Sequence, residues 1–264
     1  MIDTETRLKL KTRLKNRQRV FGCWHSFANP GITEIFTRTE VDFIGIDVEH
    51  STISQEQSQH IMRASQAAGI PCLPRIASHN GEMIKRLLDS GADGIIVPMV
   101  STTQEIEQII NWCKYSPVGR RSFGVARAQG YGFDYQEYTS NWNRSSSLII
   151  QIETVEGVNN IDKLLSYGEI DGVMVGPFDL SGSLGIPGQI EHPKVLEAVQ
   201  KVNEACLRYK KASGSHLVYP SLDDLRQVFA KGAAFAVIST DLFVLWKWAE
   251  QVREQVKILR QEEK

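Results

Sequence analysis

The stretch SLIIQIETVEGVNNIDKLLSYGEIDGVMVGPFDL, residues 147–180, contains two apolar runs separated by a helical segment. The runs at 147–153 and 171–177 are apolar almost throughout instead of alternating with polar residues. That pattern is typical of parallel strands covered on both faces. Polar and charged side chains appear only where each run ends. The stretch therefore predicts one strand–helix–strand unit with a polar edge at the carboxyl ends of its strands.

Six further runs of the same kind bring the number of candidate strands to eight. They lie at 19–27, 41–49, 70–76, 93–100, 213–219 and 234–240. Helix starts and ends between them are marked by capping patterns at Asn29–Pro30, Ser54–Gln57 and Ser221–Asp224 and by Gly69, Gly91 and Gly232. Eight such units close most economically into an α/β fold of the (β/α)₈ type, a TIM barrel. An open doubly wound sheet is the alternative, but no GxGxxG follows the first strand.

We expect a single barrel domain over residues 1–264, with a helical extension at 1–18 and a C-terminal helix at 241–264. The last helix is longer than a barrel needs, which fits packing against another subunit and fits a frayed terminal helix equally well. The segment 115–133 is too long and too rich in Gly and Arg for a simple connection. Because long barrel loops are usually functional, we expect a role for it.

Charge and cysteine usage narrow the class of protein. Lys and Arg number 30 against 31 Asp and Glu, which gives a net charge of −1 and no electrostatic case for binding nucleic acid. No apolar run approaches a membrane span, and the N-terminus is charged, so we expect neither membrane insertion nor export. The widely spaced Cys23, Cys72, Cys113 and Cys206 predict buried thiols in a reducing compartment. A soluble cytoplasmic protein is the expectation.

Polar side chains gather where four of the predicted strands end. They are Asp47, Glu49 and His50, then Arg75, then Gln151 and Glu153, and finally Asp179. Gln151 and Glu153 share one side of their strand, and Asp179 follows one unit later. Two carboxylates in one barrel mouth repel unless a cation or a proton lies between them, and oxygen ligands suit Mg²⁺ or Mn²⁺. We favour a divalent metal on Glu153 and Asp179, although either acid alone could simply cap a helix.

Arg75 and His50 complete this set of side chains. Arg75 can bind a carboxylate through two parallel hydrogen bonds, pair with Asp47 or Glu49, or do both. His50 can exchange a proton near neutral pH, whereas we interpret the other histidines as incidental; these are His25, His60, His79, His192 and His216. A cation, an arginine and a base suit the enolate of a 2-oxo acid. A lysine Schiff base would need a lysine in a strand, and none of the eight runs has one.

Several stretches resemble, in order and spacing, the HpcH/HpaI family of metal-dependent class II pyruvate aldolases. They are IDVEH (46–50), PRI (74–76), LLDSGADGIIVPMV (87–100), QIET (151–154), GPFDLSGSLG (176–185) and EHP (191–193). The resemblance covers about Val20 to Glu250. It implies Mg²⁺, Mn²⁺ or Co²⁺ as the cofactor and a hexamer, a trimer of dimers, in which C-terminal helices are exchanged between subunits.

The resemblance also implies roles for the candidate residues. Glu153 and Asp179 would bind the metal. Substrate contacts would come from Gln151, Arg75, Phe178 and Asp179. His50 would accept the proton, Arg75 would stabilise the transition state, and Asp47 and Glu49 would support them. Asp89 would raise the basicity of the histidine, although the helical pattern puts Asp89 on the far side from the mouth.

The reaction that the resemblance implies is reversible cleavage of a 4-hydroxy-2-oxo acid to pyruvate and an aldehyde. The sequence departs from the family pattern at Val48, Phe178 and His216, which places the usual aldehyde in doubt. Alternatives are oxaloacetate decarboxylation and lysis of an acyl-CoA ester, as in citrate lyase β and malyl-CoA lyases. The latter would draw on Arg120, Arg121 and Arg127. A third alternative is a catalytically silent barrel that serves as a binding subunit.

Overall fold

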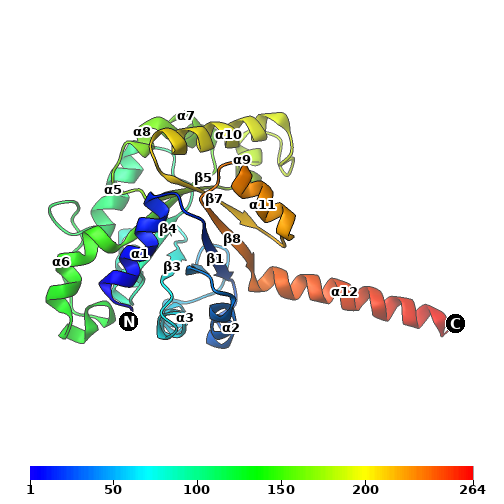
Figure 1. Ribbon diagram of the computed structural model, residues 1–264, viewed down its shortest axis with the longest axis horizontal. Coiled ribbons are helices and arrows are strands. Elements are labelled where there is room, and N and C mark those ends of the chain that lie inside the picture. Colours follow the sequence, from blue (N-terminus) through cyan, green and yellow to red (C-terminus); the bar gives the residue numbers. More distant parts are fainter. Residues whose placement is uncertain (264) are drawn as a thin grey trace.

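Eight parallel strands form a closed barrel at the centre of the computed structural model, which describes residues 1–263 (Figure 1). The strands are β1 (Val20–His25), β2 (Phe43–Asp47), β3 (Cys72–Arg75), β4 (Gly94–Val97), β5 (Ser147–Ile152), β6 (Gly172–Val175), β7 (Ala212–Leu217) and β8 (Phe235–Thr240). They follow one another in chain order, and pairing between β1 and β8 closes the sheet. The predicted (β/α)₈ barrel is confirmed, with β7 beginning one residue before its predicted run.

Helices surround the barrel and connect its strands. The α-helices are α1 (Thr4–Lys15), α2 (Pro30–Phe36), α3 (Gln55–Ala67), α4 (Gly81–Asp89), α5 (Thr103–Cys113), α6 (Tyr135–Ser145), α7 (Val155–Asn159), α8 (Ile161–Leu165), α9 (Pro177–Ser183), α10 (Pro193–Arg208), α11 (Leu222–Ala230) and α12 (Asp241–Glu262). Short 3₁₀ helices are η1 (Thr37–Thr39) and η2 (Arg127–Gly132). Ser54 with Gln57 and Ser221 with Asp224 form the expected capping boxes. The helix starts that these capping residues predicted are therefore confirmed for α3 and α11.

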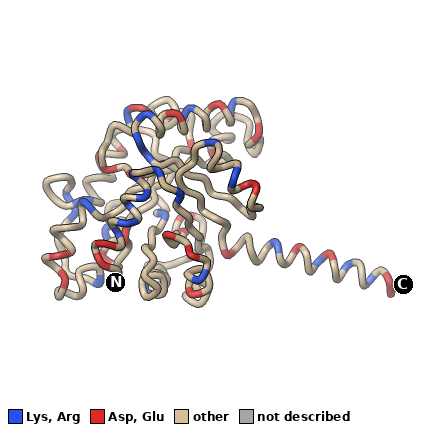
Figure 2. The backbone as a smooth tube through the Cα atoms, viewed as in Figure 1, with Lys and Arg blue, Asp and Glu red and all other residues tan. Residues whose placement is uncertain are grey.

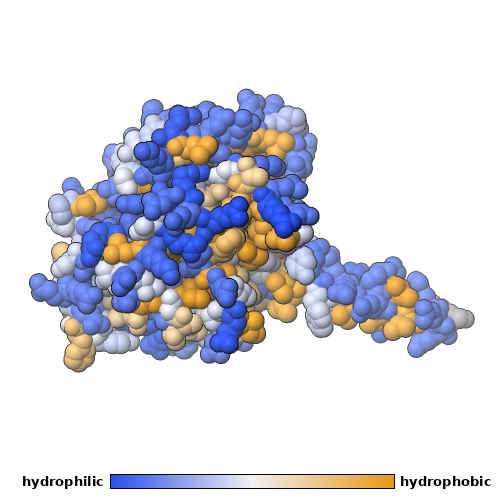
Figure 3. Space-filling view, viewed as in Figure 1, coloured by the Kyte–Doolittle hydropathy of each residue, from blue (hydrophilic) through white to orange (hydrophobic). Residues whose placement is uncertain are grey.

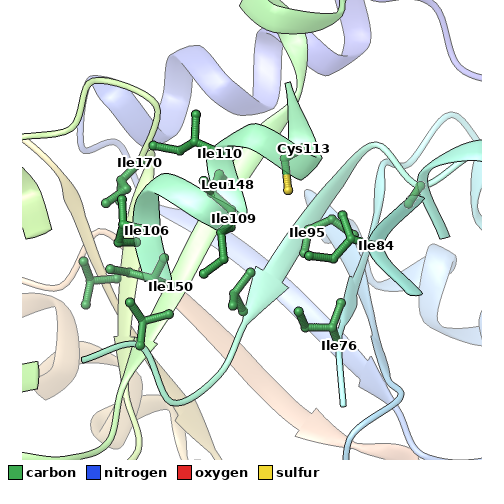
Figure 4. Packing of buried hydrophobic residues seen from close by; sticks show 14 of the residues in the cluster. Ile76, Ile84, Ile95, Ile106, Ile109, Ile110, Cys113, Leu148, Ile150 and Ile170 are labelled. Atoms are coloured by element: carbon green, nitrogen blue, oxygen red, sulfur yellow. The ribbon is translucent and has the colours of Figure 1, made fainter. Parts of the chain in front are cut away.

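The main apolar core lies between the strands and the helices, where side chains of α4 and α5 meet the outer faces of β4 and β5 (Figure 4). A second cluster fills the lower barrel interior, and Leu10 and Leu14 of α1 close it from below. There the ring of Phe235 lies where a side chain on Gly214 would be, because an added Cβ would come within 2.2 Å of it. The amino-terminal end of the barrel is thus filled, which leaves the carboxyl end for a site.

The strand registers sort the inward-facing side chains into layers. In an eight-stranded barrel the strands tilt, so a level layer advances by about one residue per strand relative to the paired residues. Starting from Trp24, this places Arg75 of β3, Gln151 of β5 and His216 of β7 at one level. Alternate strands supply each layer in such barrels. These four side chains, which we call the floor layer, lie directly beneath the mouth.

The last helix, α12, extends away from the barrel (Figure 1). Asp241 is its one buried residue; its carboxylate accepts hydrogen bonds from the backbone N–H groups of Ser26 and Phe27 and lies 3.2 Å from His25 Nδ1. Charges of both signs alternate along the helix (Figure 2), between exposed apolar side chains that Figure 3 shows in orange. The exposed aliphatic residues of α12 are Leu242, Val244, Leu245, Val256, Ile258 and Leu259, and Trp246 and Trp248 are exposed as well. The predicted long helix is confirmed, and its packing against a second subunit stays a prediction.

Two compositional expectations can be compared with the structure. Within residues 1–263, no helix combines the length and the apolar character that a bilayer crossing requires. All four cysteines are buried and form no disulfide, as their spacing predicted.

Candidate active site at the carboxyl end of the barrel

Arg75, the last residue of β3, is held by two acids that follow from β2. Its Nε and Nη2 donate to the two carboxylate oxygens of Asp47 at 3.1 and 2.8 Å, and its Nη1 lies 3.1 Å from Glu49 Oε2. The ring centroid of Trp24, in the same layer, lies 5.0 Å from the guanidinium carbon. A two-pronged ion pair combined with a cation–π contact restrains a long side chain. Arg75 is therefore oriented before any substrate arrives.

Glu153 follows β5 directly and is only 4% exposed. Its Oε1 accepts a hydrogen bond from Gln151 Nε2 at 3.0 Å, and its Oε2 accepts one from the backbone N–H of Met99 at 2.8 Å. Met99 has φ of 56°, a left-handed conformation that is costly for a methionine and that presents its N–H to the carboxylate. Gly176 leaves room for this carboxylate, because a Cβ added at Gly176 would lie 2.4 Å from Glu153 Oε1.

Negative charge is concentrated around Glu153. Burial raises the pKa of the Glu153 carboxyl to about 7; the N–H of Met99 opposes the shift, and the charges of Asp179 and Glu49 add to it. Burial also raises the pKa of Glu49, against the nearby Arg75 guanidinium, and Asp179 contributes in the same direction. Asp179 lies in the first turn of α9 and is exposed. Carboxylates that follow β2, β5 and β6 in the chain therefore share one mouth.

This donor set suits a hard divalent cation. A cation between Glu153 and Asp179 would favour the charged form of the Glu153 carboxyl, whose pKa is raised mainly by burial and further by the charge of Asp179. Among residues 1–263, no three or more His, Cys, Asp or Glu side chains are grouped as a metal cage. Two carboxylates would leave the remaining positions of such a cation to water and substrate oxygens, an arrangement that Mg²⁺ accepts. The residues present fit the predicted cofactor.

His50 lies at the rim of the mouth, with a side chain that is 69% exposed. Its backbone N–H donates to Asp47 Oδ1 at 3.0 Å, and its Nε2 lies 3.8 Å from Glu49 Oε2. Asp47 therefore shapes the turn that carries His50 while it also binds Arg75. The predicted grouping of Asp47, Glu49, His50 and Arg75 is present in the structure.

Asp89 is not brought to this group. It is the last residue of α4, which runs from the mouth back toward the amino-terminal end of the barrel. Its Oδ1 accepts a hydrogen bond from Arg121 Nη2 at 2.7 Å. Within this chain Asp89 therefore pairs with an arginine of the 115–133 segment instead of His50. Phe178 lies next to Asp179 in the first turn of α9 and is 60% exposed.

The 115–133 segment lies at the end of the barrel opposite to the mouth. It follows α5 and precedes α6 and β5, so it belongs to the amino-terminal side. Arg121 is buried and donates to the hydroxyl of Tyr138 as well as to Asp89. Arg127 is buried and donates to the carbonyl of Ser90 and to Gln66 Oε1. Arg121 and Arg127 therefore do not supply the basic surface that the acyl-CoA alternative would need near this chain's mouth, because internal partners engage both of them.

Three contributors to the site lie outside the set chosen from the sequence. The N–H of Met99 is a backbone group, which no side-chain pattern can reveal. Trp24 and His216 stack with ring centroids 5.4 Å apart at 25°. For Trp24, its inward position on β1 was an available signal. For His216, the available signal was that a polar residue occupies a strand position where the family tends to be apolar.

Comparison with known proteins agrees with this geometry. A family model described as HpcH/HpaI aldolase/citrate lyase matches residues 20–247. The chain belongs to this family. The HpcH/HpaI assignment covers all eight strands and every candidate residue named above. It identifies the protein as an enzyme of the aldolase and lyase type.

Individual HpcH/HpaI relatives cover nearly the whole chain. A 5-keto-4-deoxy-D-glucarate aldolase of Shigella dysenteriae is 32% identical over 252 residues, which are 94% of this chain and 96% of the relative. A hydroxypyruvate/pyruvate aldolase of Roseobacter denitrificans is 31% identical over 254 residues, with the same two coverages. The crystal structure of a family protein from Burkholderia cenocepacia superimposes with a TM-score of 0.87 at 26% identity, covering 94% of this chain and 99% of that one.

Proposed function

We propose that the protein is a divalent-metal-dependent aldolase that reversibly cleaves a 4-hydroxy-2-oxo acid into a pyruvate-type 2-oxo acid and an aldehyde. The observation that carries the proposal is the buried Glu153 carboxylate, held near Asp179 and Glu49 and accompanied by a pre-oriented Arg75. Family membership supports the reaction type. The relatives support a sugar-acid substrate, since one acts on 5-keto-4-deoxy-D-glucarate and another on hydroxypyruvate and pyruvate by their names.

Glu153 and Asp179 would hold the cation, Mg²⁺ by its oxygen donors, which when bound polarises the 2-oxo group of the substrate. Arg75 offers N–H donors toward the oxygen on which negative charge develops, and Gln151 lies beside it in the floor layer. His50, at the rim, accepts the proton of the C4 hydroxyl, directly or through water, as the C3–C4 bond breaks. The electron pair of that bond stays with C3 as an enolate, and return of the proton from His50 to C3, directly or through water, then gives the released 2-oxo acid.

A Schiff-base mechanism has no support in the described chain. None of the strands β1–β8 contains a lysine. The buried Lys11 and Lys114 both donate to the carbonyl of Ser146, and Lys11 also donates to Asp171 at 2.6 Å. Ser146 and Asp171 precede β5 and β6, so these amines lie at the amino-terminal end, away from Glu153. This placement favours metal-assisted over amine-assisted formation of the enolate.

The competing reactions, oxaloacetate decarboxylation and lysis of an acyl-CoA ester, pass through the same kind of enolate and differ from aldol cleavage in their leaving group or in the acid that they act on. Decarboxylation of oxaloacetate would use the same residues, whereas lysis of an acyl-CoA ester needs a phosphate-binding surface. The internal pairing of Arg121 and Arg127 counts against the surface suggested for that purpose.

The test is release of pyruvate by the purified protein from a panel of 4-hydroxy-2-oxo acids and from oxaloacetate, and release of glyoxylate from malyl-CoA, with and without EDTA. We expect cleavage of a hydroxy-oxo acid that disappears with EDTA and returns with Mg²⁺, Mn²⁺ or Co²⁺. Release that EDTA leaves unchanged, or release confined to oxaloacetate or malyl-CoA, would contradict the proposal.

A further inference from the structure

Three polar atoms of the floor layer are buried without a partner. Among residues 1–263, no hydrogen bond is formed by Trp24 Nε1, Gln151 Oε1 or His216 Nε2. Buried polar atoms in folded proteins are nearly always paired, so each exception needs an explanation. Here three exceptions fall in one layer of four residues, the fourth being Arg75. Their concentration directly beneath Glu153 points to a polar group that enters from the mouth.

The partnerless atoms differ in hydrogen-bonding character. The indole Nε1 of Trp24 can only donate, and the amide oxygen of Gln151 can only accept. The Nε2 of His216 donates or accepts according to the tautomer, because burial and the nearby Arg75 guanidinium lower the pKa of His216 to about 4 and keep the ring neutral at physiological pH. A hydroxyl group, which donates one hydrogen bond and accepts others, matches such a mixed set. A methyl group would leave all three atoms unpaired.

The position of the layer decides which end of the substrate the hydroxyl belongs to. His50 and Asp179 are exposed at the rim, whereas Gln151 is buried with Trp24 below the level of Glu153. A 2-oxo acid bound at Glu153 and Arg75 therefore lies deeper than the aldehyde, which meets it from the rim. The carboxylate and oxo groups of that acid face Arg75 and the cation site. Its C3 substituent is the part left to face the floor.

We propose that His216 is a specificity-determining residue, which hydrogen-bonds a hydroxyl on C3 of the 2-oxo acid so that the protein favours a 3-hydroxy-2-oxo acid over pyruvate. The inference rests on the proposed aldolase function and names the nucleophile that this site selects. His216 is suited to the role because its ring is held between two aromatic side chains. It stacks on Trp24, with ring centroids 5.4 Å apart and ring planes 25° apart, and its ring centroid lies 6.1 Å from that of Phe243. Trp24 in turn contacts Arg75, so the selecting ring is connected to the group that binds the acid.

The test compares aldol addition of hydroxypyruvate and of pyruvate to one aldehyde, with Mg²⁺ present. We expect a higher kcat/KM for hydroxypyruvate in the wild type. In His216→Leu, which has a side chain of similar size without ring nitrogens, the ratio of the two kcat/KM values should fall about tenfold, as loss of one uncharged hydrogen bond predicts. His216→Gln retains a donor and an acceptor and should recover part of the ratio. His60→Leu, the same change on the exposed face of α3, should leave the ratio unchanged.

A second measurement separates binding from turnover. The ratio of calorimetric Kd values for the two acids should change in the same direction as the kinetic ratio. An unchanged ratio in His216→Leu, a parallel loss with both acids, or a wild type that favours pyruvate would overturn this inference while leaving the aldolase proposal intact. A wild type that joins neither acid to an aldehyde would overturn both. The wild-type preference needs no variant, so the inference is tested even if a replacement fails to fold.

Discussion

Replacing Glu153 with Gln should make the metal-free protein more stable at alkaline pH while abolishing its activity. The carboxyl pKa is raised from the ordinary 4.5 to about 7 by burial, so the folded chain binds this proton more tightly than the unfolded chain. The resulting stabilisation is fully present below pH 4.5 and is lost as the pH rises through about 7. The shift corresponds to about 3 kcal/mol of unfolding free energy, which the charged wild-type carboxylate forfeits at pH 8.

The variant should fit the site without rebuilding it. The new carbonyl oxygen can accept from the N–H of Met99, and the new NH₂ can donate to Gln151 Oε1 once the Gln151 amide turns over, because Gln151 Nε2 faces this position in the wild type. The amide carries no charge at any of the pH values compared. In EDTA the stability of the variant relative to the wild type should therefore rise by about 3 kcal/mol between pH 4.5 and pH 8, with less than about 1 kcal/mol of this rise reached at pH 5. With Mg²⁺, only the wild type should gain stability, because only it has both carboxylates.

Urea unfolding at pH 5, 6.5 and 8, in EDTA and in excess Mg²⁺, measures these differences. Glu156→Gln, an exposed change three residues away on α7, is the matched control and should follow the wild type throughout. Pyruvate release from the best substrate of the panel gives the activity. The reasoning is refuted if the wild type and Glu153→Gln show the same dependence on pH in EDTA. It is refuted equally if Mg²⁺ stabilises both proteins to the same extent.

Three further outcomes are expected. Arg75→Lys replaces a guanidinium that binds both Asp47 carboxylate oxygens with a single ammonium group. The kcat/KM for cleavage should therefore fall about a hundredfold or more, with little change in melting temperature. A decrease of less than threefold would contradict the role assigned to Arg75. His50→Asn should lower kcat about a hundredfold, measured as pyruvate release, and full activity would remove His50 as the proton acceptor. Replacing both Trp246 and Trp248 of α12 with Glu should lower the particle mass measured by light scattering, whereas an unchanged mass would contradict subunit packing through this helix.

The barrel could be predicted because both faces of every strand are covered. Continuous apolar runs result from that environment, and right-handed crossovers leave few ways to arrange eight of them. The end of the barrel to which the 115–133 segment belongs could not be predicted in the same way. Its Gly and Arg content indicated function, but Arg121 is a structural cation between Asp89 and Tyr138. Composition does not distinguish an arginine that binds a ligand from one that joins two helices.

The site was predictable to the extent that it is made of side chains at strand ends. Parallel strands bring their carboxyl ends together, which is why Arg75 meets Asp47 and why Gln151 meets Glu153. The N–H of Met99 depends on a local left-handed conformation and leaves no trace in residue type. The burial of His216 depends on the registers of all the strands together. A single histidine in a sequence cannot reveal which side chains share its layer.

The arrangement of layers explains how one barrel tolerates this much buried polarity. Below the floor layer the interior is apolar and tightly filled, with the rings of Phe43 and Phe235 lying against glycines and α1 closing the end. That packing supplies stability which does not depend on the charge state of the mouth. The cost of the raised Glu153 pKa and of the partnerless floor atoms is confined to the uppermost levels. A bound cation would pair with the Glu153 carboxylate, and a hydroxylated 2-oxo acid would bind the partnerless atoms of the floor layer. The groups that lower the stability of the folded chain are therefore the ones that would give these ligands their affinity.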